Sequence, residues 1–167
     1  MKKVIVSILM GSDSDWEVMK EAYDAMKEFG VESDMNVMSA HRTPHEVSEF
    51  VSRAANDGKK VIIAGAGSAA HLAGVCAAHT ILPVIGVPLN ATSLGGFDAL
   101  LSTVQMPAGI PVATVAVGKS GARNAGILAV QILATSDAVL AKKLVEYKQN
   151  MAKKVKEKNT KMQQTLG

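Results

Sequence analysis

His41 and Arg42 stand side by side in a polar segment and are the residues best suited to chemistry in this sequence. An imidazole has an ordinary pKa of about 6.5, so it takes up and releases protons near neutral pH. A guanidinium binds a phosphate group through two parallel hydrogen bonds. The pair therefore indicates proton transfer beside a bound phosphate ester. The alternatives are an ordinary loop histidine and a surface arginine paired with a carboxylate.

A second polar segment, Gly11 to Asp15, follows an apolar run and precedes a helical pattern. Gly11 permits a tight turn, Ser12 or Asp13 can cap the helix, and the N–H groups at the helix start favour a phosphate or a carboxylate. Asp15 can accept hydrogen bonds from the hydroxyls of a sugar. Such a turn fits a ligand site and a simple helix cap about equally well.

Both segments are expected at one edge of a parallel sheet. The aliphatic run at 4–10 predicts a buried strand, and the alternation at 31–39 predicts a strand near the sheet edge. Loops that follow parallel strands lie at the same edge of the sheet. His41 and Arg42 are therefore expected beside the turn at 11–15.

The helix after this pair is expected to begin at Thr43. Thr43 as the N-cap, Pro44 at the first helical position and Glu46 three residues after the cap would form a capping box. His45 is then expected to be exposed in the first turn. A metal site is not expected, because His41 and His45 straddle a helix start and no third ligand lies nearby in the sequence.

Strands and helices alternate along the rest of the chain, which predicts a flavodoxin-like three-layer α/β/α sandwich with a central parallel five-stranded sheet. Residues 1–167 are expected to form a single domain, with an α/β core at 1–137 and a C-terminal helix and tail at 138–167. The further strands are expected at 60–64, 83–87 and 112–117, and the further helices at 16–29, 71–78, 97–105, 122–134 and 138–162. The helix at 122–134 is apolar nearly all round and should be buried.

The segment after the third expected strand, residues 65–70, formally matches the dinucleotide fingerprint G-x-G-x-x-A. We reject that interpretation because no Asp or Glu occurs between Asp57 and Asp98, where the acid that binds the ribose should lie. The glycines then permit either close helix–sheet packing or the approach of backbone amides to a small ligand. His71 and His79 follow in a helical pattern that is more typical of packing residues.

Composition narrows the classes of function. Aromatic residues make up only 4% of the chain, which argues against a flavin or a nucleic acid stacked on rings. A receiver domain would need a phosphorylated Asp at the end of the third strand, where the chain has Ala64-Gly65. The lone Cys76 fits a reducing compartment, so a cytoplasmic protein is expected. No run approaches the roughly 20 apolar residues of a membrane span.

The basic residues are concentrated in the C-terminal tail. Residues 142–167 carry eight lysines and two glutamates, a charge of +6, whereas residues 1–141 carry a charge of −3. Without a recognisable motif, this tail is more typical of a solvated helix face than of a nucleic-acid site. One apolar stripe also runs along the last helix: Leu140, Leu144, Tyr147, Met151 and Val155. A single stripe on so long a helix predicts a homo-oligomer.

Six motifs occur together between residues 11 and 112, within a stretch of similarity to one family that runs from about residue 4 to 147. They are Gly11-Ser12-x-Ser14-Asp15-Trp16, Ser39-Ala40-His41-Arg42-Thr43-Pro44, Ile63-Ala64-Gly65-Ala66-Gly67, Ala69-Ala70-His71-Leu72, Gly86-Val87-Pro88 and Val104-Gln105-Met106-Pro107-x-Gly109-Ile110-Pro111-Val112. As a set they resemble the bacterial class I N5-carboxyaminoimidazole ribonucleotide mutases of purine biosynthesis. The resemblance implies an isomerase that converts N5-carboxyaminoimidazole ribonucleotide into 4-carboxy-5-aminoimidazole ribonucleotide without a metal or organic cofactor.

The resemblance also implies roles for individual residues. His41 matches the general acid/base of the family, and Ser12, Asp15 and Arg42 match its substrate-binding positions. The resemblance implies further substrate contacts at Gly11, Ser14, Ser39, Ala40, Gly67, Ser68, Ala69, His71 and Leu72. It implies a homo-octamer with sites shared between subunits, and a substrate supplied by the synthetase that makes N5-carboxyaminoimidazole ribonucleotide.

The chemistry of this conversion requires the kinds of residue that the resemblance implies. Moving a carboxylate from the exocyclic nitrogen to a ring carbon needs one proton delivered as CO2 leaves, and another removed after the carbon attacks CO2. One imidazole can do both in turn. The transient CO2 must not escape, so a closed pocket lined by small residues such as Gly67, Ser68 and Ala69 is expected.

Two other functions stay open: direct carboxylation of aminoimidazole ribonucleotide by CO2, and a non-catalytic flavodoxin-like module that binds a phosphate ligand. Animal-type carboxylases usually have lysine at the position of Arg42 and lack the Gly-Ala-Gly and His-Leu run, which favours the mutase. The chain departs from the family at Ser68, where glycine is usual, and at Ala73, where proline is usual. Ser68 is expected to narrow the pocket and Ala73 to loosen the helix start.

Overall fold

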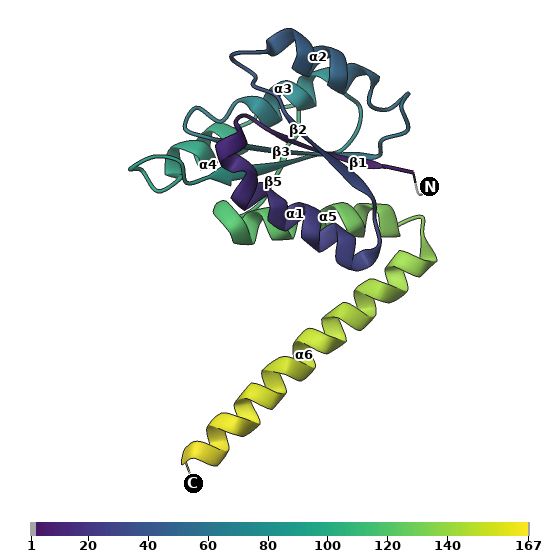
Figure 1. Ribbon diagram of the computed structural model, residues 1–167, viewed down its shortest axis with the longest axis vertical. Coiled ribbons are helices and arrows are strands. Elements are labelled where there is room, and N and C mark those ends of the chain that lie inside the picture. Colours follow the sequence, from purple (N-terminus) through teal and green to yellow (C-terminus); the bar gives the residue numbers. More distant parts are fainter. Residues whose placement is uncertain (1–2, 167) are drawn as a thin grey trace.

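The aliphatic runs of the sequence form a five-stranded parallel sheet in the order β2-β1-β3-β4-β5, with helices on both of its faces (Figure 1). The computed structural model describes residues 3–166. This strand order is that of the flavodoxin-like fold and confirms the predicted three-layer sandwich. The strands are β1 (Val6–Met10), β2 (Ser33–Val37), β3 (Val61–Gly67), β4 (Val84–Leu89) and β5 (Ala113–Thr114).

Two apolar cores fill the space between the sheet and the helices. One core lies between the sheet and α1 with α5, and the other lies between the sheet and α2 with α3. Leu140 at the start of α6 joins the first core. The helices are η1 (Asp13–Asp15, a 3₁₀ turn), α1 (Trp16–Phe29), α2 (Pro44–Arg53), α3 (Leu72–His79), α4 (Phe97–Val104), α5 (Gly118–Ala134) and α6 (Ala138–Leu166).

Burial along the strands follows their place in the sheet. Every residue of β1 is buried, as expected for a central strand covered on both faces, whereas the residues of β2 are intermediate or exposed. β2 is an edge strand, as its alternating pattern predicted. Gly30 ends α1 with φ 75°, a left-handed conformation that glycine adopts without steric cost.

The glycine-rich segment after residue 64 is part of a strand rather than the predicted loop. β3 continues to Gly67 because Gly65, Ala66 and Gly67 pair with the end of β4. A Cβ at Gly65 would lie 2.2 Å from the sulfur of Met19, and one at Gly67 would lie 2.5 Å from Cβ of Ala91. Gly65 therefore permits close packing of α1 on the sheet, the first of the two alternatives, whereas Gly67 lies against the loop after β4.

Other boundaries also differ from the predictions. β4 runs on to Leu89 instead of ending at 87, and β5 is confined to two residues of the predicted 112–117. α5 begins at Gly118, four residues earlier than predicted, and α6 continues to Leu166. Within α5 the small residues face the core and Ile127, Leu128 and Ile132 are only partly buried, so the helix is not enclosed all round.

Helix α5 packs directly on the backbone of α1 at Gly126. A Cβ built there would lie 2.5 Å from the backbone oxygen of Ala22 and 3.0 Å from Cβ of Ala25. Gly126→Ala is therefore expected to lower the free energy of unfolding by about 1–3 kcal/mol, although alanine is the better helix former. Thermal unfolding measures the change, with Gln131→Ala at an exposed position of α5 as the control. An unchanged melting temperature would mean that the two helices separate easily.

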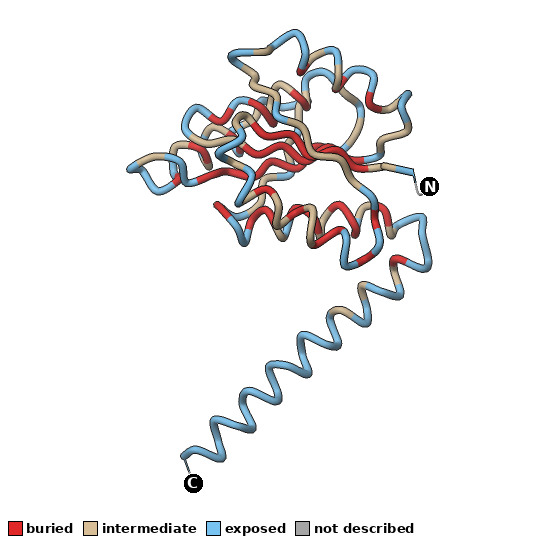
Figure 2. Tube along the Cα trace, in the orientation of Figure 1, coloured by how far each residue is buried: buried red, intermediate tan, exposed pale blue. Residues whose placement is uncertain are grey.

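The last helix leaves the body of the molecule after its first turns (Figure 2). Leu140 is buried, and the ring of Tyr147 packs edge-on against Phe29 with centroids 5.4 Å apart. Lys143 Nζ donates a hydrogen bond to the backbone oxygen of Phe29 at 2.6 Å. From residue 148 onward the described residues are exposed. None of the described helices is long and apolar enough to cross a membrane.

Candidate active site

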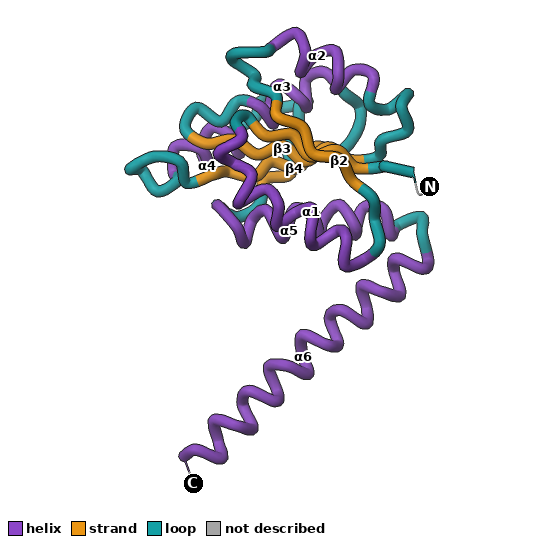
Figure 3. Tube along the Cα trace, viewed as in Figure 1, coloured by secondary structure: helices purple, strands orange, loops and turns teal. Residues whose placement is uncertain are grey.

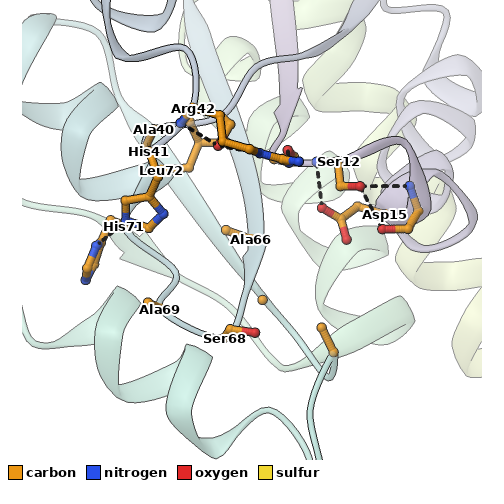
Figure 4. Close-up of a pocket in the computed structure, with 15 residues that line it drawn as sticks. Ser12, Asp15, Ala40, His41, Arg42, Ala66, Ser68, Ala69, His71 and Leu72 are labelled. Atoms are coloured by element: carbon orange, nitrogen blue, oxygen red, sulfur yellow. Dashed lines mark hydrogen bonds between the residues drawn. The ribbon is translucent and has the colours of Figure 1, made fainter.

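Loops follow β1, β2 and β3 at their carboxyl ends, as the teal segments of Figure 3 show. Residues of these loops line one pocket of about 350 Å³ (Figure 4). All the site residues predicted from the sequence line it: Gly11, Ser12, Ser14, Asp15, Ser39, Ala40, His41, Arg42, Gly67, Ser68, Ala69, His71 and Leu72. Sequence reasoning missed Ala66 and Ala91, which complete the lining. Ala91 belongs to the glycine-containing loop after β4, and an alanine there carries no chemical signal of its own.

The segment that follows β1, residues 11–15, is called the first loop. It is held by a reciprocal pair of hydrogen bonds. Ser12 Oγ accepts from the backbone N–H of Ser14 at 3.3 Å, and the Asp15 carboxylate accepts from the backbone N–H of Ser12 at 3.1 Å. This is a capping box around η1, so Ser12 rather than Asp13 is the capping residue. The arrangement fixes the hydroxyl of Ser12 and the carboxylate of Asp15 side by side at the pocket.

Burial raises the pKa of the Asp15 carboxyl above its ordinary value of 3.8. The hydrogen bond from Ser12 and the positive charge of Arg42 oppose this shift, and the negative charge of Asp13 adds to it. The folded chain therefore binds this proton more tightly than the unfolded chain does. Its contribution to stability is present at low pH and is lost as the pH rises from about 3.8 through the raised folded pKa.

Asp15→Asn is therefore expected to raise the melting temperature at pH 7, because it removes a charge that burial disfavours. The asparagine oxygen can still accept the hydrogen bond from Ser12. The gain should shrink toward pH values below 3.8, where the carboxyl of the parent protein is neutral as well. Thermal melts from pH 3 to 8 measure the change, with Asp13→Asn in the same turn as the control. A variant that is less stable than the parent at pH 7 would contradict this account.

The segment between β2 and α2, residues 38–43, is called the second loop. The side chain of Thr43 closes it. Its Oγ1 accepts from the backbone N–H of Ser39 at 3.0 Å and donates to the Ser39 carbonyl at 3.2 Å. Thr43 and Pro44 occupy the predicted N-cap and first helical positions, but Thr43 makes no side-chain cap bond, so the predicted capping box with Glu46 is wrong. The hydroxyl instead fixes the loop that carries His41.

Arg42 joins the second loop to the first. Its Nη2 donates to the backbone oxygen of Gly11 at 2.6 Å, and its Nε donates to Ser39 Oγ at 3.4 Å. The backbone N–H of Arg42 also donates to Ser39 Oγ at 3.2 Å. The predicted meeting of the two loops therefore occurs, and the guanidinium is held at the pocket with N–H groups to spare for a ligand.

His41 contacts a second histidine that lines the same pocket. Its Nε2 lies 2.7 Å from Nδ1 of His71, with ring centroids 4.9 Å apart and ring planes at 79°. His71 is exposed and paired, so its predicted packing role is wrong. His79 is exposed as well and lies 3.4 Å from Ser48 Oγ, so it is not a packing residue either. His45 is exposed, as predicted.

The loop after β3, residues 68–71, is called the third loop, and it holds Ser68 in a backbone conformation that favours glycine. Among the described residues, Ser68 is the one residue other than glycine with a positive φ, at 55°. A side chain costs roughly 1–2 kcal/mol in this left-handed region, and glycine avoids that cost. Helix α3 still begins at Leu72, with Ala73 buried at the usual proline position. The narrowing of the pocket by Ser68 and the looser helix start at Ala73 both stay predictions.

Cys76 is poorly suited to nucleophilic catalysis. Burial raises the pKa of the Cys76 thiol to about 12, which makes it a poor nucleophile. Among residues 3–166, no three side chains of His, Cys, Asp or Glu gather closely enough to hold a metal ion. The titratable groups at the pocket are Asp15, His41, Arg42 and His71.

The chain is similar to known proteins over nearly its whole length. Residues 5–154 match the model of the AIR carboxylase family. The chain is similar to the N5-carboxyaminoimidazole ribonucleotide mutase of Bacillus subtilis, with 55% identity over 153 residues that cover 92% of this chain and 94% of that protein. The corresponding protein of Mycobacterium leprae is 51% identical over 162 residues, 97% of this chain and 94% of its own. The crystal structure of Treponema denticola PurE superposes with a TM-score of 0.85 at 31% identity, covering 94% of this chain and 97% of that one.

Proposed function

The chain belongs to the AIR carboxylase family, and from that premise we propose that the pocket binds the ribonucleotide and that His41 transfers the protons of the reaction. The reaction is the conversion of N5-carboxyaminoimidazole ribonucleotide into 4-carboxy-5-aminoimidazole ribonucleotide, an isomerisation in de novo purine biosynthesis. The observation that carries the residue roles is the hydrogen bond of Arg42 to Gly11, which joins the histidine loop to the serine–aspartate turn.

Three side chains suit the phosphate and ribose of the substrate. The guanidinium of Arg42 has five N–H donors, of which two are used within the protein, so others remain for phosphate oxygens. The hydroxyl of Ser12, at the start of η1, donates to Asp13 Oδ1 at 3.2 Å and would turn from it to donate to the same phosphate. The Asp15 carboxylate accepts from Ser12 through one oxygen and can accept from ribose hydroxyls through the other.

His41 is proposed to move one proton in each direction. Protonated His41 gives its proton to the exocyclic nitrogen as the bond from that nitrogen to the carboxylate carbon breaks, which releases CO2 and leaves aminoimidazole ribonucleotide. The ring carbon C4 then attacks CO2 and forms the new carbon–carbon bond, and His41 removes the proton from C4. The histidine ends protonated, as it began, so no external proton or cofactor is consumed.

Small residues are proposed to hold the CO2 close to the ring carbon. Gly67, Ser68 and Ala69 line the pocket on the side of β3, and Ala91 packs against Gly67. Their short side chains leave room for a small molecule beside the base, and they offer few polar groups to water.

We further propose a cytoplasmic homo-octamer, one mutase domain per chain over residues 1–167, with substrate delivered by the synthetase that makes it and with no nucleic acid or membrane partner. Exposed apolar side chains support an oligomer. Phe97, Leu101 and Val104 form one exposed side of α4, and Met151 and Val155 continue the stripe of α6.

A direct assay tests the function. The purified chain is mixed with N5-carboxyaminoimidazole ribonucleotide, and formation of the 4-carboxy product is followed with and without added bicarbonate. A mutase forms product at a rate that bicarbonate does not change. A direct carboxylase would instead need aminoimidazole ribonucleotide and would speed up with bicarbonate, and a binding module would bind the nucleotide without turnover. Either of those results would overturn the proposal.

A further inference from the structure

Two histidines from different loops share a hydrogen bond at the pocket. His41 belongs to the loop after β2, and His71 directly precedes α3, thirty residues later. The 2.7 Å between His41 Nε2 and His71 Nδ1 is a hydrogen-bond distance, so one hydrogen lies between the two nitrogens. Figure 4 places His71 on the outer side of His41, away from Arg42 and Ser12.

Only one direction of this hydrogen bond lets His41 act as both acid and base. If Nδ1–H of His71 donated, neutral His41 would carry its proton on Nδ1, and giving that proton away would leave an imidazolate anion. If Nε2–H of His41 donates, the Nδ1 of His41 is free to alternate between N–H and a lone pair. His41 then gives a proton as a cation and regains one as a neutral ring without changing tautomer.

The short gap between the two nitrogens has room for one hydrogen only. Arg42 is the neighbouring residue on the same loop, and Asp15 from the first loop is the remaining charged group of the lining. Two imidazolium rings that faced each other through these nitrogens would also have two hydrogens in one short gap. One of the two nitrogens must therefore be an acceptor, and the direction that His41 needs makes Nδ1 of His71 that acceptor.

We infer that His71 is a positioning residue, whose Nδ1 accepts Nε2–H of His41 and leaves Nδ1 of His41 to give and take the proton. This inference rests on the proposed function of His41, but it assigns His71 to His41 rather than to the substrate. His71 keeps its own hydrogen on Nε2 and passes none to the substrate. Its effect is to fix the ring orientation and tautomer of its neighbour, as outer partners of histidine ligands do in metal sites.

A set of variants separates this role from a merely structural one. His71→Asn keeps an acceptor oxygen near the position of Nδ1, whereas His71→Leu has a similar shape and no acceptor. We expect kcat to fall about 10- to 100-fold in His71→Leu with little change in KM, and to recover largely in His71→Asn. The pH–rate profile of His71→Leu should shift, because its His41 has lost an acceptor. His79→Asn, at an exposed histidine outside the pocket, is the control and should behave like the parent protein.

Nitrogen NMR of the parent protein tests the same point without any variant. The chain has four histidines, so their ring signals can be assigned with single substitutions. We expect neutral His41 to carry its proton on Nε2, and a mixture of tautomers in His71→Leu. A neutral His41 protonated on Nδ1, or a His71→Leu variant with unchanged kcat and pH profile, would overturn the inference. Full activity of His41→Asn would instead overturn the proposed function, so the two failures are distinguishable.

Discussion

Replacing His41 with asparagine is expected to abolish turnover, with a fall in kcat of about 10²- to 10⁴-fold, while nucleotide binding stays largely intact. Asparagine fills a similar volume and keeps a polar side chain, but it cannot take up or release a proton near neutral pH. The residues proposed to bind the phosphate and ribose lie in the first loop and at Arg42, so their contacts should persist. Steady-state kinetics and calorimetric titration with the product measure the two effects separately.

His45→Asn is the matched control for this experiment. His45 is exposed in the first turn of α2, four residues after His41, and lies outside the pocket lining. The control should keep the kcat of the parent protein. Near-normal turnover of His41→Asn would remove His41 from the mechanism, and a loss of nucleotide binding in that variant would mean that the imidazole binds the substrate rather than moving its protons.

The parts of the fold that could be predicted from sequence depend on local patterns. Residues 4–10 are aliphatic throughout because β1 is covered on both faces, and residues 31–39 alternate because β2 is an edge strand. Once the strands are parallel, the loops after β1 and β2 must lie at one edge of the sheet. The meeting of Arg42 with the turn at Gly11 follows from that rule and needed no knowledge of side-chain geometry.

The failed predictions depend on contacts between distant segments. The glycines at 65 and 67 resemble a loop locally, but pairing with β4 and packing by Met19 and Ala91 make them part of a strand. Thr43 could bond either forward to its helix or back to Ser39, and the path of the loop decides in favour of Ser39. Nothing near His71 in the sequence indicates that its partner would be His41.

Arg42→Ala is expected to raise KM by about 10- to 100-fold with a much smaller change in kcat. A hydrogen bond to a charged group contributes roughly 1.5–3 kcal/mol, and a phosphate would lose its bidentate partner in this variant. The substitution also removes the hydrogen bond to Gly11, so the first loop is held less firmly. Arg42→Lys keeps the positive charge but not the planar fork, so its KM should lie between those of the parent and the alanine variant.

Initial rates over a wide range of substrate concentrations separate these effects on KM and kcat. Arg53→Ala is the control, because Arg53 is an exposed arginine on α2 whose salt-bridge partner is Glu49 of its own helix. Arg53→Ala changes the net charge by the same amount as Arg42→Ala. A loss of general electrostatic attraction for the anionic substrate would therefore raise KM in both variants. An unchanged KM in Arg42→Ala would mean that the phosphate of the substrate binds at another place than Arg42. A large fall in kcat alone would mean that Arg42 chiefly positions the loop of His41.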